Sequence, residues 1–314
     1  MTFDEAHERP HEVGPDLAWA ESYAFDLYDP REGLGGFLRL AVRPNEGAME
    51  VGLHFLLSDG GLIVARHVRP VRENVADLEI GDVRFAMVAP LARWKVSYDG
   101  PAHSLASARD AAKPEAWRKS RVERLGVDLS LEATSPALGE PGRFAQAVRW
   151  TGTVWVSGDE YRVDCRGLRA RAWGARDWES VRLARVLSIG FGDDFALAVA
   201  QVQAGRDEGE RQHGWIFRGG RALGIRRVDL STATEAESHL PKALSLALTD
   251  DAGSQYEIRG EVLQVMPLPR SRSGRQTLVC ESVARFDCGP ETGFGFVTTV
   301  DELDATGQPV ASSG

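Results

Sequence analysis

Short apolar runs of strand length, each closed by a turn signal, constrain the fold more than any other feature of this sequence. Residues 51–57 form such a run, Ser58-Asp59-Gly60-Gly61 follows, and residues 62–65 resume it. Two apolar runs joined by a short Gly-containing connection are typical of a β-hairpin. The same pattern predicts turns at residues 157–159, 192–194, 219–220 and 251–253, and a hairpin from residues 277–287 to 293–301. The spacing is that of successive antiparallel strands and not of βαβ units.

Helical signals are few. The best candidates are residues 104–112, continuing past Pro114 towards Arg121, and residues 234–239. Residues 93–98 are predicted to be a strand that ends at Asp99-Gly100-Pro101. Residues 205–212 and 268–275 are polar and rich in Gly or Arg, which predicts loops.

Each half of the chain offers a similar number of strands and hairpins. Two antiparallel barrels explain this symmetry most simply, because closing a sheet removes its exposed edges. The predicted fold class is therefore all-β, with two antiparallel barrels and few short helices.

Composition limits the partners and the compartment. The net charge of −9 over 314 residues, without a long basic run, argues against nucleic acid or an anionic membrane as the main partner. No stretch approaches the roughly 20 apolar residues that span a bilayer. Residues 1–21 are polar and lack a signal-peptide core, and the cysteines (Cys165, Cys280, Cys288) are odd in number. These features predict a cytoplasmic protein with free cysteines.

The usual cofactor and nucleophile motifs do not fit. The seven histidines form no His-x-His or His-Glu-x-x-His pattern, which disfavours a metal site. The glycines Gly33, Gly35 and Gly36 lack the following Lys-Ser/Thr of a phosphate loop and instead suit a tight turn. There is no Gly-x-Ser-x-Gly elbow. We therefore expect neither a cofactor nor a metal ion.

Several segments carry a family resemblance, and they occur in the right order along the chain. They are residues 23–36, Arg93-Trp94-Lys95 with Tyr98 and Gly100, residues 152–178 and residues 293–296. Together they resemble an uncharacterised bacterial family related to AttH-like proteins and to carotenoid hydratases of the hydroxyneurosporene synthase type. The resemblance implies two lipocalin-like (calycin-like) barrels packed side by side. We assign residues 1–21 to a polar leader, 22–170 to the first barrel and 171–314 to the second.

The central motif of that family is only half preserved. Relatives read Arg-Asp-His-Ser-Trp-Gly-x-Arg-Asp-Trp, and residues 169–178 here read Arg-Ala-Arg-Ala-Trp-Gly-Ala-Arg-Asp-Trp. Ala170 and Arg171 thus replace the aspartate and histidine. Hydrating or isomerising an alkene needs a strong, desolvated proton donor, which alanine and arginine do not supply. If relatives use that aspartate, this chain has lost their mechanism.

Three interpretations of the remaining motif stay open. Trp173 and Trp178 can be core aromatics, with Arg176 and Asp177 making local hydrogen bonds. Asp177 can be a replacement acid, with the two tryptophans stabilising a carbocation. Alternatively, an arginine- and aromatic-lined pocket grips a carboxylate or hydroxyl of a ligand.

Three further residues complete the predicted ligand site. Trp94 lies in a strand-like run and suits either a barrel core or the wall of an apolar pocket. His54 lies in the apolar run 51–57, where a structural role competes with a functional one. If Arg171 faces inward, it needs a protein carboxylate or an anionic ligand as its partner.

The resemblance implies an apolar pocket, because known relatives handle polyenes, isoprenoids or polyketide-like substrates. The first hypothesis is binding of an apolar small molecule of isoprenoid, steroid, polyene or acyl type in a barrel. The second is a cofactor-independent hydratase, isomerase or cyclase with Asp177 as the acid. The third is an interaction scaffold with a vestigial pocket. The sequence does not predict the oligomeric state.

Overall fold

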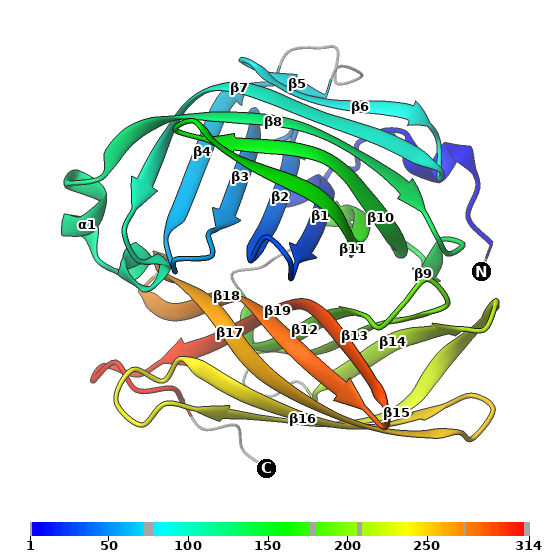
Figure 1. Cartoon of the computed structure of the whole chain (residues 1–314). Coiled ribbons are helices and arrows are strands. Elements are labelled where there is room, and N and C mark those ends of the chain that lie inside the picture. Colours follow the sequence, from blue (N-terminus) through cyan, green and yellow to red (C-terminus); the bar gives the residue numbers. More distant parts are fainter. Residues whose placement is uncertain (1, 72–77, 176–179, 206–208, 273, 311–314) are drawn as a thin grey trace. The chain divides into compact units, whose positions relative to one another are not determined.

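The computed structural model describes residues 2–71, 78–175, 180–205, 209–272 and 274–310. They are mainly antiparallel strands, and their helices are short: η1 (Glu5–Glu8), η2 (Ala108–Ala112) and α1 (Pro114–Arg118). The predicted all-β class with few helices is confirmed (Figure 1). None of these helices has the length and apolarity that a membrane crossing requires.

The chain divides into two compact units. Unit 1 comprises Met1–Ala106 and Trp117–Arg176, and unit 2 comprises Ser107–Ala116 and Asp177–Gly314. The excursion into unit 2 carries η2, which packs on strand β17 (Gln255–Arg272). Arg109 holds it there through two hydrogen bonds to Glu235, of 3.0 and 2.5 Å.

Unit 1 is an 11-stranded sheet with the order β4-β3-β2-β1-β11-β10-β8-β7-β6-β5, and β9 pairs with β10. Its strands are β1 (Trp19–Asp29), β2 (Leu34–Arg43), β3 (Ala48–Leu56), β4 (Leu62–Pro70), β5 (Glu79–Ile80), β6 (Val83–Ala89), β7 (Arg93–Leu105), β8 (Arg121–Ala133), β9 (Leu138–Glu140), β10 (Arg143–Val156) and β11 (Asp159–Ala175). The predicted hairpins β3–β4 and β10–β11 are confirmed.

Unit 1 returns on itself through a short pairing of β4 with β7, from Leu62↔Leu105 to Val64↔His103. β7 shares this edge with β6, which pairs with it as far as Ser97. The closure is therefore limited to one end of β7, whereas unit 2 is a fully closed barrel.

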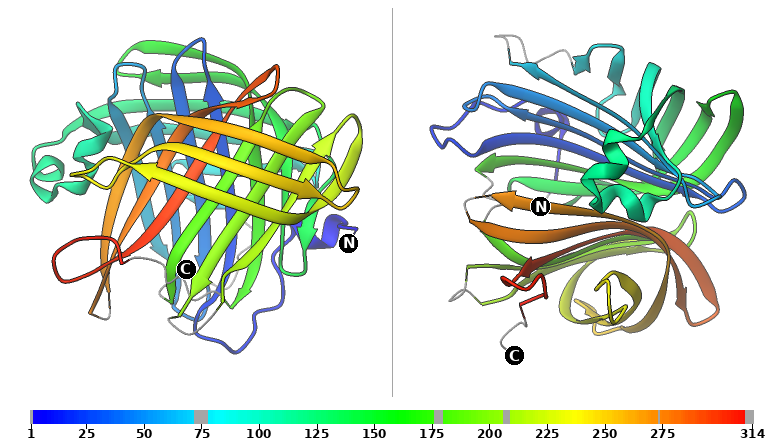
Figure 2. Two further views of the ribbon diagram at one scale, coloured as in Figure 1. Left: turned by 90° about the horizontal axis from the view of Figure 1, so that it is seen from below. Right: turned by 90° about the vertical axis from the view of Figure 1, so that its left-hand side faces the viewer.

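Unit 2 is an eight-stranded antiparallel barrel in which sequential strands are neighbours and β12 meets β19 (Figure 2). The strands are β12 (Val181–Gly190), β13 (Phe195–Ala204), β14 (Arg211–Arg218), β15 (Arg221–Thr234), β16 (Pro241–Asp250), β17, β18 (Arg275–Cys288) and β19 (Glu291–Leu303). The four hairpins predicted in this half are all present.

Three local predictions were wrong. Strand β7 does not end at Asp99-Gly100-Pro101 but continues to Leu105, because its pairing with β8 runs on to Ser104↔Arg121. Residues 234–239 form a turn that closes the β15–β16 hairpin through the bond from the Glu235 N–H to the Leu240 carbonyl. Residues 268–275 are largely strand, because β17 and β18 extend their pairing to Arg272↔Arg275.

Alternation of side chains along each strand builds a separate core in each unit. In unit 1 the largest fully buried apolar side chains include Trp94, Trp150 and Phe25, and in unit 2 they include Phe195 and Phe286. Cys165, Cys280 and Cys288 are free and buried. Burial raises the pKa of each thiol, so none has the thiolate character of a nucleophile.

Candidate functional site

Strand β11 carries two arginines into the interior of unit 1. Arg169 and Arg171 are 2% and 0% exposed and continue the line of Val163 and Cys165, which belong to the core. Ala170 lies between them and is exposed, because successive residues of a strand point to opposite faces. At the position where relatives carry the motif aspartate, the side chain therefore points away from this interior.

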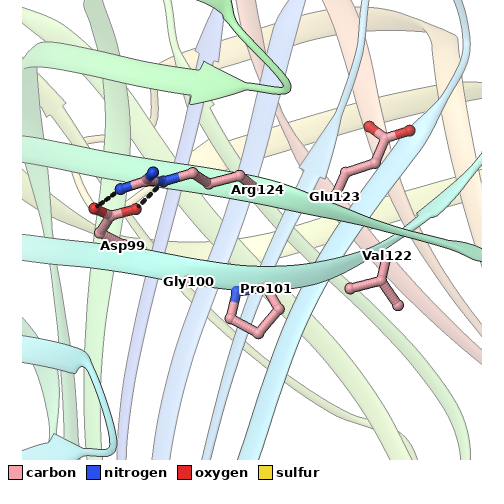
Figure 3. A pocket seen from close by; sticks show the side chains of 6 residues that line it. All are labelled: Asp99, Gly100, Pro101, Val122, Glu123 and Arg124. Carbon is pink, nitrogen blue, oxygen red and sulfur yellow. Dashed lines mark hydrogen bonds and ion pairs between the residues drawn. The ribbon is translucent and has the colours of Figure 1, made fainter.

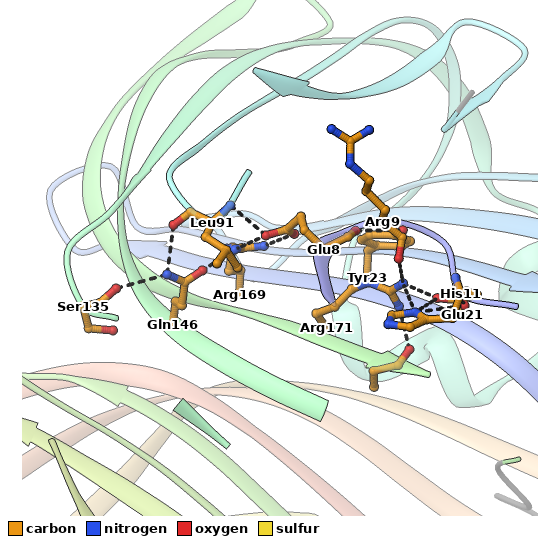
Figure 4. Close-up of polar contacts among 11 residues, drawn as sticks. Glu8, Arg9, His11, Glu21, Tyr23, Leu91, Ser135, Gln146, Arg169 and Arg171 are labelled. Carbon is orange, nitrogen blue, oxygen red and sulfur yellow. Dashed lines mark hydrogen bonds and ion pairs between the residues drawn. The ribbon is translucent and has the colours of Figure 1, made fainter. Parts of the chain in front are cut away.

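Arg169 is held by a carboxylate from the segment that precedes β1. Its two terminal nitrogens donate to the two oxygens of Glu8 at 2.6 and 2.7 Å (Figure 4). Glu8 is fully buried and accepts a third hydrogen bond, from the Leu91 backbone N–H at 2.9 Å. Gln146 accepts from Arg169 and donates to the Leu91 carbonyl at 3.0 Å. A buried bidentate pair of this kind fixes both partners in orientation.

Arg171 is paired in a similar way with Glu21, a buried residue of β1. Its terminal nitrogens also donate to the carbonyls of Ala172 at 2.8 Å and Arg9 at 3.1 Å. Arg171 thus faces inward, and the partner that its burial requires is a protein carboxylate.

Aromatic rings surround both guanidinium groups. The Cζ atom of Arg171 lies 4.1 Å from the ring centroid of Tyr23 and 5.4 Å from that of Trp173. Arg169 lies 5.3 Å from Phe144 and 6.0 Å from Trp94. These distances are within the range of cation–π attraction. We call the following residues the aromatic–arginine cluster: Arg169, Arg171, Tyr23, Phe25, Trp94, Phe144 and Trp173.

Strand register explains why these residues meet. Tyr23 of β1 and Phe144 of β10 both lie directly opposite Arg171 of β11. Phe25 and Gln146 flank Arg169 in the same manner. Directly opposed side chains on one face of an antiparallel pair are close neighbours. Tyr23, Arg171 and Phe144 therefore form one row of the sheet, and Phe25, Arg169 and Gln146 form the row two residues along, both fixed by backbone pairing.

Residues 3–11, which we call the covering segment, lie against this cluster. Phe3 packs on Phe144 at 5.0 Å between ring centroids, and His11 stacks on Trp173 at 4.1 Å with an interplanar angle of 9°. Within the segment only Phe3 and Glu8 are buried. Besides these rings and the Glu8 carboxylate, backbone groups hold it: the His11 N–H donates to Glu21 at 2.8 Å, and the Arg9 carbonyl accepts from Arg171.

Burial sets the ionisation of the titratable groups beside the arginines. It raises the pKa of Tyr23, against the opposing effect of Arg171, so the phenol stays protonated. It lowers the pKa of His11, although the nearby Glu21 carboxylate opposes this, so the neutral ring is the favoured form. Among the described residues, no group of three or more His, Cys, Asp or Glu side chains could hold a metal ion.

Two hollows in unit 1 lie away from the cluster. One of about 320 Å³ is lined by Asp99, Gly100, Pro101, Val122, Glu123 and Arg124 (Figure 3). The other, of about 890 Å³, shares the Asp99–Arg124 ion pair and also has Lys95 and Trp155 in its wall. Neither has Trp94, Arg171, Trp173 or His54, the described residues of the predicted ligand site, in its wall. Both are open to solvent and have charged residues in their walls, unlike an enclosed apolar ligand pocket.

The predicted site residues separate into three groups. Trp94, Arg171 and Trp173 come together in the aromatic–arginine cluster. His54 is half-buried on β3, where it stacks on Phe37 of β2, outside the cluster. Arg176, Asp177 and Trp178 lie outside the described residues.

Sequence reasoning missed Glu8, Glu21 and Leu91. Glu21 had a usable signal, because it is in phase with Tyr23, Phe25 and Leu27 along one strand. Glu8 had none, since it is separated from Arg169 by 161 residues and lies in a polar stretch. Leu91 contributes through its backbone, which has φ +57°, an uncommon value for a residue with a side chain.

Comparisons with known proteins support the fold. A family model described as a domain of unknown function (DUF7064) matches residues 4–302. Among curated proteins none matches. An AttH-like protein from Nitrosomonas europaea has 15% identity and a TM-score of 0.68, over 95% of this chain and 96% of that one.

Two further solved structures share this fold. Kievitone hydratase from Nectria haematococca has 9% identity and a TM-score of 0.59, with 95% of each chain covered. CghA in complex with Sch210972 has 12% identity and a TM-score of 0.59, over 90% of this chain and 88% of that one. The predicted resemblance to AttH-like proteins and hydratases is confirmed at the level of fold.

Proposed function

The chain belongs to the DUF7064 family, and from the site itself we propose that unit 1 binds a small molecule with an apolar body at the aromatic–arginine cluster. One observation carries this proposal: two guanidinium groups, both almost completely buried, lie among five aromatic side chains. Ligand sites are typically aromatic walls with a few fixed polar groups. The cluster has that composition.

Stability alone does not account for the cluster. A buried ion pair gains little over well-packed apolar residues of similar size, because desolvating both charges offsets their attraction. The neighbouring inward positions of β1 and β10, Leu27 and Val148, are apolar. Apolar side chains at the positions of Arg169 and Arg171 would therefore be enough to build a core in this part of the sheet.

The cluster also keeps an unused donor. The indole N–H of Trp94 is buried and has no hydrogen-bond partner within the described part of the chain, and its ring lies 6.0 Å from Arg169. A buried polar group without a partner costs free energy, so a ligand acceptor there would be stabilising.

Fluorescence titration tests the proposal, with all-trans-retinol as the apolar probe. We expect saturable quenching of tryptophan emission, and we expect Trp94→Phe to remove much more of it than Trp155→Phe. Trp155 is 38% exposed on β10 and is the matched control. Linear, non-saturating quenching that is equal in both variants would rule out binding at the cluster.

A second candidate is a cofactor-independent hydratase, isomerase or cyclase, favoured by the fold likeness to kievitone hydratase. Fold does not transfer activity. Glu8 and Glu21 both accept hydrogen bonds from arginine, so the proton donor would be Asp177. Replacing Asp177 with asparagine keeps the shape and removes the acid. Unchanged turnover of an alkene substrate by Asp177→Asn would exclude this role.

A further inference from the structure

The carboxylate of Glu8 occupies what is in effect a carboxylate-binding site. Both of its oxygens are bound by Arg169, and one of them also accepts from the Leu91 N–H. Bidentate arginine with an added backbone donor is a strong and geometrically specific way to bind a carboxylate. The three donors come from β11 and from the turn before β7, so the sheet supplies them without help from the covering segment.

One of these donors, the Leu91 N–H, is held in place by a backbone conformation that costs free energy. Leu91 adopts φ +57°, which places its N–H on Glu8 and its carbonyl on Gln146. Left-handed backbone at a residue other than glycine costs free energy and persists only where its surroundings enforce it. Gln146 enforces it by accepting from Arg169 and donating to both Leu91 and Ser135.

The group bound there is a side chain of the covering segment, which lies at the surface of unit 1. Most side chains of the covering segment are exposed, and Glu8 is its one buried charged residue. Withdrawing Glu8 would leave Arg169 buried without a counter-charge, which is strongly unfavourable. Any displacement of the segment therefore requires another anion in its place.

We propose, resting on the proposed function, that Glu8 stands in for the carboxylate of the ligand: unit 1 binds an apolar carboxylic acid, and the covering segment competes with it for Arg169 and the Leu91 N–H. The carboxylate of the ligand pairs with Arg169, and its apolar body lies against Trp94, Phe144 and Tyr23. The unpartnered N–H of Trp94 is available to an oxygen of the same ligand.

Chemical rescue of Glu8→Ala tests whether Arg169 and the Leu91 N–H, which we call the cradle, bind a free carboxylate. It does so without knowledge of the ligand. This variant removes a CH₂–COO⁻ group, which acetate restores and the neutral isostere acetamide does not. At about ten times its dissociation constant, acetate is expected to raise the melting midpoint by about 3–6 °C. Acetamide should give no rise, and neither compound should shift Glu12→Ala, an exposed acid just outside the covering segment.

Matched probes then separate this inference from the proposed function. Retinoic acid is expected to bind Glu8→Ala at least roughly tenfold more tightly than the unaltered protein, while retinol binds both equally. Equal affinity of retinoic acid for both proteins, with retinol bound, overturns the inference and leaves the proposed function. Rescue by acetate without binding of either retinoid supports the cradle and overturns the proposed function.

Should Glu8→Ala not fold in buffer, its refolding yield in acetate compared with acetamide replaces the melting midpoint. Glu8→Gln, which keeps the side-chain volume and removes the charge, then serves for the retinoic acid titration. A yield that is equal in acetate and acetamide overturns the inference.

Discussion

Replacing Arg169 with methionine removes the guanidinium group from the interior of unit 1 and keeps an unbranched apolar side chain in place of the arginine stem. Glu8 would then lose its two bonds of 2.6 and 2.7 Å and remain a buried carboxylate with one backbone donor. Leaving one partner of a buried ion pair uncompensated costs about 3–5 kcal/mol. The attraction of opposite charges at roughly 4 Å with an effective dielectric constant of 20 is about 4 kcal/mol, which agrees.

The double variant Glu8→Leu/Arg169→Met tests whether the loss comes from one unpaired buried charge. With both charges gone, no buried charge is left unpaired, and we expect its free energy of unfolding to lie within about 1 kcal/mol of the unaltered protein. Each single variant should lose about 3–5 kcal/mol, or roughly 6–20 °C in melting midpoint for a unit of this size. The coupling energy between the two sites should therefore be about 5 kcal/mol or more.

Urea unfolding followed by tryptophan fluorescence measures all four proteins, with linear extrapolation to water. A cost of less than about 1 kcal/mol for Arg169→Met alone would contradict this prediction. Such a value is typical of an exposed ion pair and would mean that Glu8 and Arg169 are not desolvated together.

Because burial lowers the pKa of His11, the folded state resists protonation of this ring, so stability falls as the pH drops below about 6.5. The hydrogen-exchange rate of residues 3–11, corrected for intrinsic rates, should therefore rise between pH 7 and pH 5. No such rise is expected in His11→Gln. Burial alone would raise the pKa of Asp29, but hydrogen bonds from Arg31 and from backbone outweigh it and lower the pKa. Asp29→Asn should therefore lower the free energy of unfolding by about 1–2 kcal/mol near pH 7, and this difference should disappear as the pH falls below about 4. A difference that is constant with pH would contradict this. In Gly167→Ala the added Cβ would overlap a backbone carbonyl oxygen of β1. This clash should lower the free energy of unfolding by about 3 kcal/mol or more, as measured by urea unfolding. Gly209→Ala, where the Cβ meets open space, should change it very little.

Most hairpins were predictable because their signals are local. Turn residues such as Ser58-Asp59-Gly60-Gly61 act within a few positions, and the alternation of residues 51–57 follows directly from the pleat of a strand. Two of the failures arose where strand pairing continued past residues that resemble a strand end or a loop. Gly100 and Pro101 resemble a strand end, yet β8 pairs with β7 across both positions.

The candidate site divides along the same line. The family motif drew attention to Arg171 and Trp173, and the sequence predicted that an inward arginine needs an anionic partner. Whether Arg171 faces inward depends on the phase of β11, and the identity of its partner depends on β1 lying beside β11, more than 100 residues away in the chain.

By itself the sequence determined an antiparallel all-β chain, and it supplied the arginines and the aromatic side chains that make up the cluster. Only the tertiary structure decided that Glu8 reaches Arg169, that Ala170 points away from the interior, and that Leu91 turns its N–H towards a carboxylate. The physical reason is the range of the interactions. Alternation and turn chemistry act between near neighbours, whereas the partner of a buried charge is chosen by which strands and segments close over it.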